Sequence, residues 1–192
     1  MDSIVRSECI KDEYYTPRYG VLPILPYIPK NRIVWCPFDT SRSEFIRVFR
    51  ELGIQCVYSH LCFSQDFYDY QPPQWDIIVS NPPFSDRARS LKRCIELKKP
   101  FALLLPNIWL NNAPILRLVR DYNLQLLMPD QRIEFLRNGR VSLTTSYFCR
   151  NLLSERLIVQ SLNKDSKQSS GMYDDPDLIR YLKAPILNNK QR

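Results

Sequence analysis

The sequence predicts an α/β domain with a mostly parallel central sheet, helices on both faces and a late antiparallel hairpin. Short apolar runs with strand character alternate with amphipathic stretches at helical spacing, which is typical of βαβ units. The 192 residues suit one domain with a full core and leave little room for a second. Only 4 glycines stand against 15 prolines, so we expect comparatively stiff turns.

The first half of the chain supplies three of these strands. An apolar run ends at Pro37, as a buried strand would, and a third run leads directly into Asn81. Between them, apolar side chains recur at helical spacing up to Gly53, a natural helix stop. The expected strands are 32–36, 54–58 and 75–80, and the expected helices are 43–53 and 90–98.

The second half continues the alternation. We expect strands at 101–105 and 124–128, a helix at 113–122, and a late strand with aromatic character at 142–149. Asn138-Gly139 is a strong turn signal for a hairpin. Four arginines surround this hairpin and would suit phosphate contacts, although a solvated basic face explains them equally well: Arg132, Arg137, Arg140 and Arg150.

The predicted domain covers residues 1–160, and residues 161–192 form a polar linker with a short C-terminal appendage. The stretch 163–171 is polar and lacks aliphatic residues, which is typical of a linker. Apolar residues at near-helical spacing follow within 178–182. We expect this end either to dock weakly or to remain mobile.

Composition narrows the class of protein. The net charge of +7 and the pI near 9.1 favour polyanionic partners, although a basic surface alone explains them as well. The chain has neither a long apolar run nor a signal-peptide pattern, so we expect a cytoplasmic protein without membrane contact. The six cysteines form no CxxC pair and His60 is the single histidine, so we expect free thiols and no metal.

Three polar segments follow strand ends: Pro37-Phe38-Asp39, Ser59-His60 and Asn81-Pro82-Pro83-Phe84. Ligands of parallel sheets bind at the carboxyl ends of the strands, so these segments mark one place to look for function. The four residues Asn81-Pro82-Pro83-Phe84 are by themselves a weak signal of a functional site, because a Pro-Pro turn can simply cap a strand. The strand before and the helix after strengthen the signal.

The segment Asn81-Pro82-Pro83-Phe84 resembles the signature of class I S-adenosylmethionine-dependent amino-methyltransferases of DNA. The resemblance implies that the Asn81 side chain and the Pro82 carbonyl accept hydrogen bonds from the target amine. This draws the nitrogen lone pair toward the methyl group, and Pro83 helps to hold the backbone in place. The resemblance also implies that Phe84 stacks on a base flipped out of the duplex.

Other segments extend the resemblance over about residues 12–150. Residues 12–17 resemble the segment that closes over the cofactor in N6-adenine methyltransferases, 65–67 the element that contacts its adenine, and 100–106 a core strand. The order looks closest to small adenine methyltransferase-like proteins of bacteriophages, which implies DNA rather than RNA as substrate and host cytoplasm as location. The candidate S-adenosylmethionine-binding residues are Tyr15, Thr16, Pro17, Pro37, Asp39, His60, Asp66 and Phe67.

The cofactor loop departs from the family pattern. The leading acid is replaced by Cys36, and both glycines are absent from residues 36–43. Asp39 either replaces that acid or caps the helix that begins near Ser43. An alternative function follows: a methyltransferase fold without catalysis that binds nucleic acid or a host defence complex. RNA, or glutamine in a protein, would also fit an Asn-Pro-Pro-aromatic site.

Overall fold

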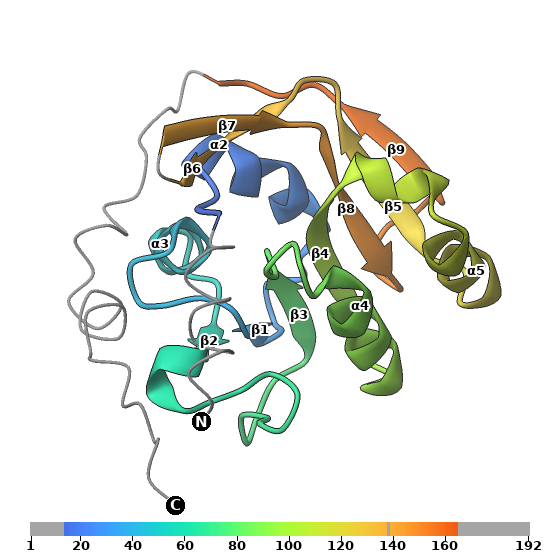
Figure 1. The fold of residues 1–192 in the computed structure, drawn as a ribbon. Coiled ribbons are helices and arrows are strands. Elements are labelled where there is room, and N and C mark those ends of the chain that lie inside the picture. Colours follow the sequence, from blue (N-terminus) through green and yellow to red (C-terminus); the bar gives the residue numbers. More distant parts are fainter. Residues whose placement is uncertain (1–13, 138, 165–192) are drawn as a thin grey trace, which may run out of the picture.

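The computed structural model describes residues 14–137 and 139–164, which form a seven-stranded sheet and a separate hairpin (Figure 1). The sheet order is β2-β1-β3-β4-β8-β5-β9. Of the seven strands only β8 is reversed, because both of its neighbours pair with it antiparallel. The strands are β1 (Val34–Cys36), β2 (Cys56–Tyr58), β3 (Ile77–Ser80), β4 (Phe101–Pro106), β5 (Gln125–Pro129), β8 (Thr145–Arg150) and β9 (Leu157–Gln160), and the hairpin strands are β6 (Ile133–Arg137) and β7 (Gly139–Leu143).

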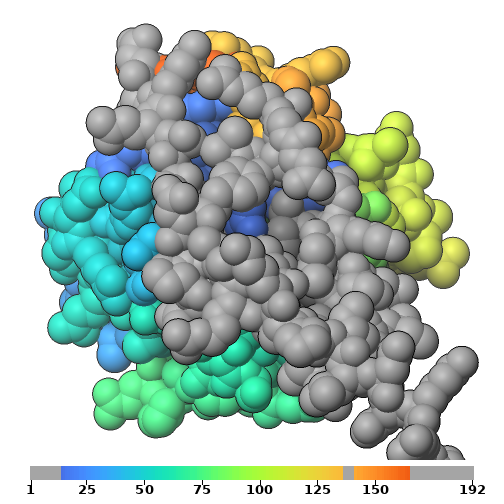
Figure 2. All heavy atoms as spheres, turned by 60° about the vertical axis from the view of Figure 1, so that its left-hand side comes forward, coloured from blue at the N-terminus to red at the C-terminus, as the bar shows by residue number. Residues whose placement is uncertain are grey.

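Helices cover both faces of the sheet. Buried residues alternate along β1, with Val34 and Cys36 packed against α3 on one face and Trp35 against α4 on the other. Figure 2 shows the atoms of the region around α3 in cyan on the left and those of the η3–α5 region in yellow-green on the right. The helices are α2 (Arg18–Val21), α3 (Glu44–Glu51), α4 (Arg87–Glu96) and α5 (Ala113–Asp121), with 3₁₀ turns η1 (Leu22–Tyr27), η2 (Leu61–Phe63) and η3 (Asn107–Asn111).

The predicted architecture is confirmed: an α/β fold, a mostly parallel sheet, helices on both faces and a late antiparallel hairpin. The single strand expected at 142–149 was wrong. The chain leaves one sheet and enters another at Thr144, because β7 pairs with β6 whereas β8 inserts between β4 and β5. Gly53 follows α3 with φ of 67°, as its role as a helix stop requires.

The strand order reverses at β1. The chain passes from β1 to β2 on one side and then returns to β3 on the other. The loops after β1 and β3 therefore diverge at their shared carboxyl edge, and such a switch point is where open α/β sheets bind ligands. Pro37 and Asn81 begin these two loops.

The predicted turn residue Asn138 and the predicted appendage at 165–192 lie outside the described residues. Within them, Leu162 is buried and its backbone N–H donates to Asp130 Oδ1 at 2.9 Å. None of the described helices is long and apolar enough to cross a membrane. The same residues contain no group of three His, Cys, Asp or Glu side chains that could hold a metal ion.

Candidate functional site

Asp39 and Ser80 join the loops after β1 and β3. The Ser80 hydroxyl donates a 2.6 Å hydrogen bond to Asp39 Oδ2, and both side chains are buried. Ser80 is the last residue of β3, directly before Asn81. The N-cap position of α3 is Ser43. The carboxylate of Asp39 therefore lies at the switch point, next to the candidate amine site.

The amide of Asn81 has a defined orientation. Its Nδ2 donates to the backbone carbonyl of Tyr14 at 2.8 Å, and a carbonyl can only accept, so the other amide atom is the oxygen. Asn81 Oδ1 is buried and has no hydrogen-bond partner in the structure as described. A buried unpaired acceptor costs about 1–3 kcal/mol, so this oxygen is suited to a donor supplied by a ligand.

Phe84 lies in an aromatic cluster. Its ring stacks on Tyr14 with centroids 4.5 Å apart and an interplanar angle of 24°, and it meets the edge of Phe135 at 5.7 Å. Phe84 is 5% exposed, Pro82 is buried and Pro83 is half-buried. One face of Phe84 is thus covered by Tyr14, and a base could stack there only after that ring had moved.

The segment Tyr15-Thr16-Pro17 is buried and leads into α2. Its position depends on close packing at Gly20, where an added Cβ would lie 3.0 Å from Thr16 Cγ2 and 3.3 Å from Ile133. The hydroxyl of Tyr147 donates to the Gly20 carbonyl at 2.7 Å. Strand β8 therefore holds the segment that carries three of the predicted cofactor residues.

The loop after β2 lies beside the loop after β1. The Asp39 N–H donates to the Ser59 carbonyl at 3.2 Å, and the Ser59 hydroxyl accepts from the Trp35 indole at 2.9 Å. His60 is buried, and its Nδ1 accepts from the Cys62 N–H at 3.1 Å. In the neutral ring the proton is then on Nε2.

Asp66 and Phe67 are connected to the site by the contact between the Phe67 and Phe38 rings. The Phe67 ring packs on Phe38 at 4.9 Å and on Trp35 at 5.4 Å, and it is 2% exposed. Asp66 Oδ1 accepts from the Tyr68 N–H at 3.1 Å, a contact that stabilises the local turn. Both residues have local structural roles beside the Pro37 loop.

Five segments that are distant in sequence thus meet at one edge of the sheet. Four contacts connect them: Asn81 to Tyr14, Asp39 to Ser80, Asp39 to Ser59, and Phe38 to Phe67. All twelve residues predicted for the site lie in these segments. The sequence reading missed Tyr14 and Ser80, although each directly precedes a predicted residue.

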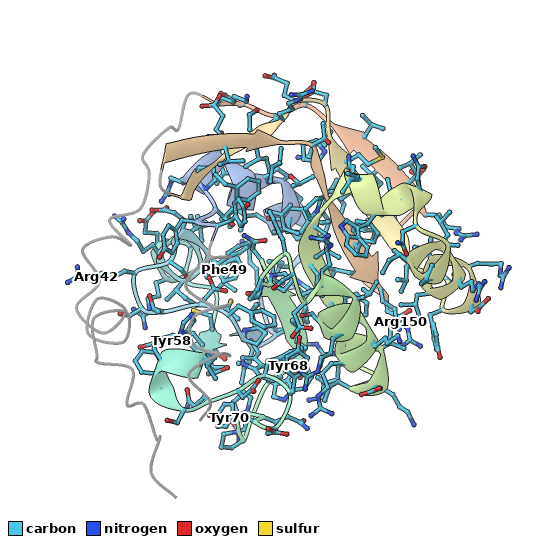
Figure 3. The ribbon with its side chains drawn as sticks, viewed as in Figure 1. Arg42, Phe49, Tyr58, Tyr68, Tyr70 and Arg150 are labelled. Atoms are coloured by element: carbon cyan, nitrogen blue, oxygen red, sulfur yellow. The ribbon has the colours of Figure 1, made fainter. Side chains whose placement is uncertain are left out.

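The predicted phosphate contact at Arg150 is away from this edge. Arg150 pairs with Phe101, the first residue of β4, so it lies at the amino edge of the parallel strands. Figure 3 shows it at the tip of β8, and its guanidinium donates to the Ile95 carbonyl at 3.3 Å. Arg132 is exposed just before β6, and Arg137 and Arg140 lie on the hairpin strands with side chains outside the described part.

The thiols beside the site are not poised for catalysis. Burial raises the pKa of Cys36, and the nearby carboxylate of Asp39 raises it further. Cys36, Cys94 and Cys149 are buried, and Cys56 and Cys62 are half-buried. All five of these described cysteines are free thiols, as the sequence predicted. Protonated buried thiols are poor nucleophiles, so Cys36 acts as part of the core.

No protein-family model matches the chain, and no curated protein matches it. Three solved structures resemble it in fold. A candidate RNA methyltransferase from Pyrococcus horikoshii is 14% identical over 80% of this chain and 96% of that one, with a TM-score of 0.47. A predicted O-methyltransferase from Agrobacterium tumefaciens is 10% identical over 76% and 84%, with a TM-score of 0.37. A candidate class I S-adenosylmethionine-dependent methyltransferase from Listeria monocytogenes is 10% identical over 86% and 68%, with a TM-score of 0.40.

Proposed function

We propose that this protein is an S-adenosylmethionine-dependent methyltransferase that modifies the N6 amine of adenine in DNA. The observation that carries the proposal is Asn81 Oδ1, a buried acceptor without a partner in the described structure, fixed in orientation at the switch point of the sheet. An exocyclic amine would supply the missing donor.

The amine on a purine ring is a weak nucleophile because its lone pair is delocalised into the ring. Two acceptors that converge on its hydrogens hold the nitrogen in a more tetrahedral geometry, with the lone pair directed at the methyl donor. Asn81 Oδ1 would supply one acceptor and the Pro82 carbonyl the other. Pro83 restricts the backbone between them and Phe84, so the acceptors are preorganised.

The residues at this edge fit the proposed cofactor, which when bound supplies an electrophilic methyl group. Asp39 brings a buried carboxylate beside the amine site, and His60 brings a buried imidazole to the neighbouring loop. Phe67 and Phe38 form an apolar wall suited to an adenine ring. Tyr15, Thr16 and Pro17 would cover the site, Pro37 would shape the loop, and Asp66 would hold the turn before Phe67.

The experiment is methyl transfer from labelled cofactor to unmethylated DNA, with RNA and protein substrates in parallel. Asn81→Ala is expected to lower the rate by about 100-fold or more, since it removes a preorganised acceptor. Ser90→Ala is the matched control, because Ser90 is a buried polar residue of α4 outside the site. Full activity of Asn81→Ala, or no transfer by the wild type to any substrate, would sink the proposal.

A second candidate function is a binding protein without catalysis, directed at nucleic acid or a host defence complex. Two observations favour it: the loop of residues 36–43 contains no glycine, and Tyr14 covers both Asn81 and Phe84. Calorimetry with S-adenosylmethionine separates the two. Binding in the micromolar range supports the enzyme, and no binding at millimolar cofactor supports the binding protein.

A further inference from the structure

Thr145, the first residue of β8, carries a buried hydroxyl that has no hydrogen-bond partner within the described residues. Its side chain belongs to a residue that is only 2% exposed. Most buried polar groups in proteins are hydrogen-bonded, and valine would fill the same space without a polar atom. Folding alone therefore gives no reason for a hydroxyl at this position. Like Asn81 Oδ1, the Thr145 hydroxyl is suited to a ligand.

Thr145 shares a face of the sheet with the candidate amine site. Side chains alternate between the two faces along a strand. Tyr147 and Cys149 of β8 belong to the buried cluster that also contains Phe84 and Phe135. Thr145 lies two residues before Tyr147, so its side chain is on that same face. The Thr145 hydroxyl and the aromatic side chain of the Asn-Pro-Pro-Phe segment are therefore on one side of the sheet.

The strand pairing gives the separation between Thr145 and Asn81. Ser80 pairs with Leu103, and Leu103 pairs with Phe148, so these three residues lie in one row across β3, β4 and β8. Toward the carboxyl edge of the parallel strands, Asn81 is one residue beyond this row, and Thr145 is three residues beyond it because β8 is reversed. Two strand spacings of about 4.8 Å and two residue steps of about 3.3 Å place their Cα atoms about 12 Å apart.

A purine base can bridge this separation with one hydrogen bond at each end. Its exocyclic amine would meet Asn81 Oδ1, and its remote edge would point toward Thr145. On adenine that edge carries N3, an acceptor, which matches a hydroxyl donor. N1 and N7 flank the amine, so they would lie too near Asn81 to reach Thr145. Between the two residues lies Pro106, which pairs with Thr145, is buried and has an apolar side chain.

We infer that Thr145 is a specificity residue that donates a hydrogen bond to N3 of the target adenine and so selects a purine over a pyrimidine. This inference rests on the proposed function and adds the residue that recognises the far edge of the base. Cytosine also carries an exocyclic amine, but its single ring would leave the Thr145 hydroxyl without a partner. A site with an unmet polar group discriminates against the ligand that fails to fill it.

The test is fluorescence anisotropy with a labelled oligothymidine of about 20 nucleotides that carries one variable base at its centre. The variable base is adenine, 3-deazaadenine, 7-deazaadenine or cytosine, and the all-thymine strand gives the background. The wild type is expected to bind the 3-deazaadenine strand about five-fold more weakly than the adenine strand, because one hydrogen bond is lost. The 7-deazaadenine strand should bind within about two-fold of the adenine strand.

Thr145→Val removes the hydroxyl and keeps the shape of the side chain. It is expected to bind the adenine strand about five-fold more weakly than the wild type and to bind adenine and 3-deazaadenine alike. Its preference for adenine over cytosine should fall by a similar factor. Its Tm should equal or exceed that of the wild type, because a methyl group replaces an unpaired buried hydroxyl. Thr145→Ser keeps the hydroxyl and should retain the wild-type preferences.

Ser146→Ala is the matched control. Ser146 also has a buried hydroxyl without a partner among the described residues, and it is the next residue along β8. It pairs with Leu105, which belongs to the buried cluster on the opposite face of the sheet. Ser146→Ala is therefore expected to bind each of the strands within about two-fold of the wild type.

An unchanged preference for adenine over 3-deazaadenine in Thr145→Val would overturn the inference, as would a wild type without that preference. Loss of the preference in Ser146→Ala as well would also overturn it. A preference that depends on Thr145, without methyl transfer to any substrate, would sustain the base contact while the proposed activity fails. Methyl transfer to adenine with the preference intact in Thr145→Val would do the reverse.

Discussion

The Ser80 hydroxyl at the end of β3 donates a buried hydrogen bond of 2.6 Å to Asp39 in the loop after β1. The bond ties the loop after β1 to the residue that precedes Asn81. Replacing Ser80 with alanine leaves the Asp39 carboxylate with one donor fewer, which costs about 1.5–3 kcal/mol for a charged acceptor. We expect Ser80→Ala to weaken S-adenosylmethionine binding by about ten-fold, measured by calorimetry.

Ser90→Ala serves as the comparison for this variant. Ser90 is also fully buried and hydrogen-bonded, to Tyr68, but it lies on α4 away from the Asp39 loop. Both variants should lose thermal stability, and only Ser80→Ala should lose cofactor affinity. Equal cofactor affinity in the two variants would show that the Ser80–Asp39 bond has only a structural role.

Tyr14 should compete with a base for the face of Phe84. An aromatic pair is worth about 0.5–1.5 kcal/mol, so removing the Tyr14 ring should strengthen binding of a flipped base by about 2- to 10-fold. We expect this gain in Tyr14→Ala, measured with an oligonucleotide that carries 2-aminopurine at the target position. Tyr14→Phe keeps the ring and should behave as the wild type. A loss of affinity in Tyr14→Ala would mean that Tyr14 contributes to the base site.

Glu44 should make stability depend on pH. Burial raises its pKa above 4.5, and Arg47 and Arg18 oppose this only in part. The folded state therefore holds this proton at a higher pH than the unfolded state does. Stability from this group increases as the pH falls through the raised pKa toward 4.5 and is lost as the pH rises again.

Glu44→Gln cannot titrate and isolates this contribution. The free energy of unfolding of the variant minus that of the wild type should be more negative at pH 4.5 than at pH 7. Urea denaturation at both pH values measures this difference. The shared titration of other groups cancels in that difference. A difference that does not change with pH, or that changes in the opposite direction, would contradict the prediction.

Gly53 should be required for its backbone conformation alone. Its φ is 67°, and an added Cβ would meet no atom within 4 Å. Gly53→Ala should therefore cost about 1 kcal/mol, which lowers Tm by about 2–4 °C in a chain of this size. Gly53→Asn should cost less, because asparagine tolerates the left-handed region. Equal Tm values for alanine and glycine would refute this explanation.

The sequence predicted the strands that form apolar runs between helices, and it missed β9. Trp35 and its neighbours form an uninterrupted apolar run, as a strand covered on both faces must. Strand β9 was missed although it contains an apolar run, because it is only four residues long and partly exposed at the edge of the sheet.

The candidate site could be predicted where residues adjoin a strand end. Asn81 was found because two prolines follow a buried strand, and chain order placed it on the carboxyl edge. Its contact with Tyr14 spans 67 residues and depends on tertiary packing that no local pattern encodes. The position of Arg150 could not be predicted, because periodicity identifies a strand without giving its direction, and β8 is the reversed strand.

The place of β8 also bears on the order in which the molecule can form during synthesis. Among the described strands, β5 pairs only with β8 and β9, and both are translated after it. While a nascent chain ends before Thr145, β5 has no neighbour in the sheet, and Gly20 lacks its contact with Tyr147. The N-terminal segment beside Asn81 would then be secured only late in translation, after β8 had left the ribosome.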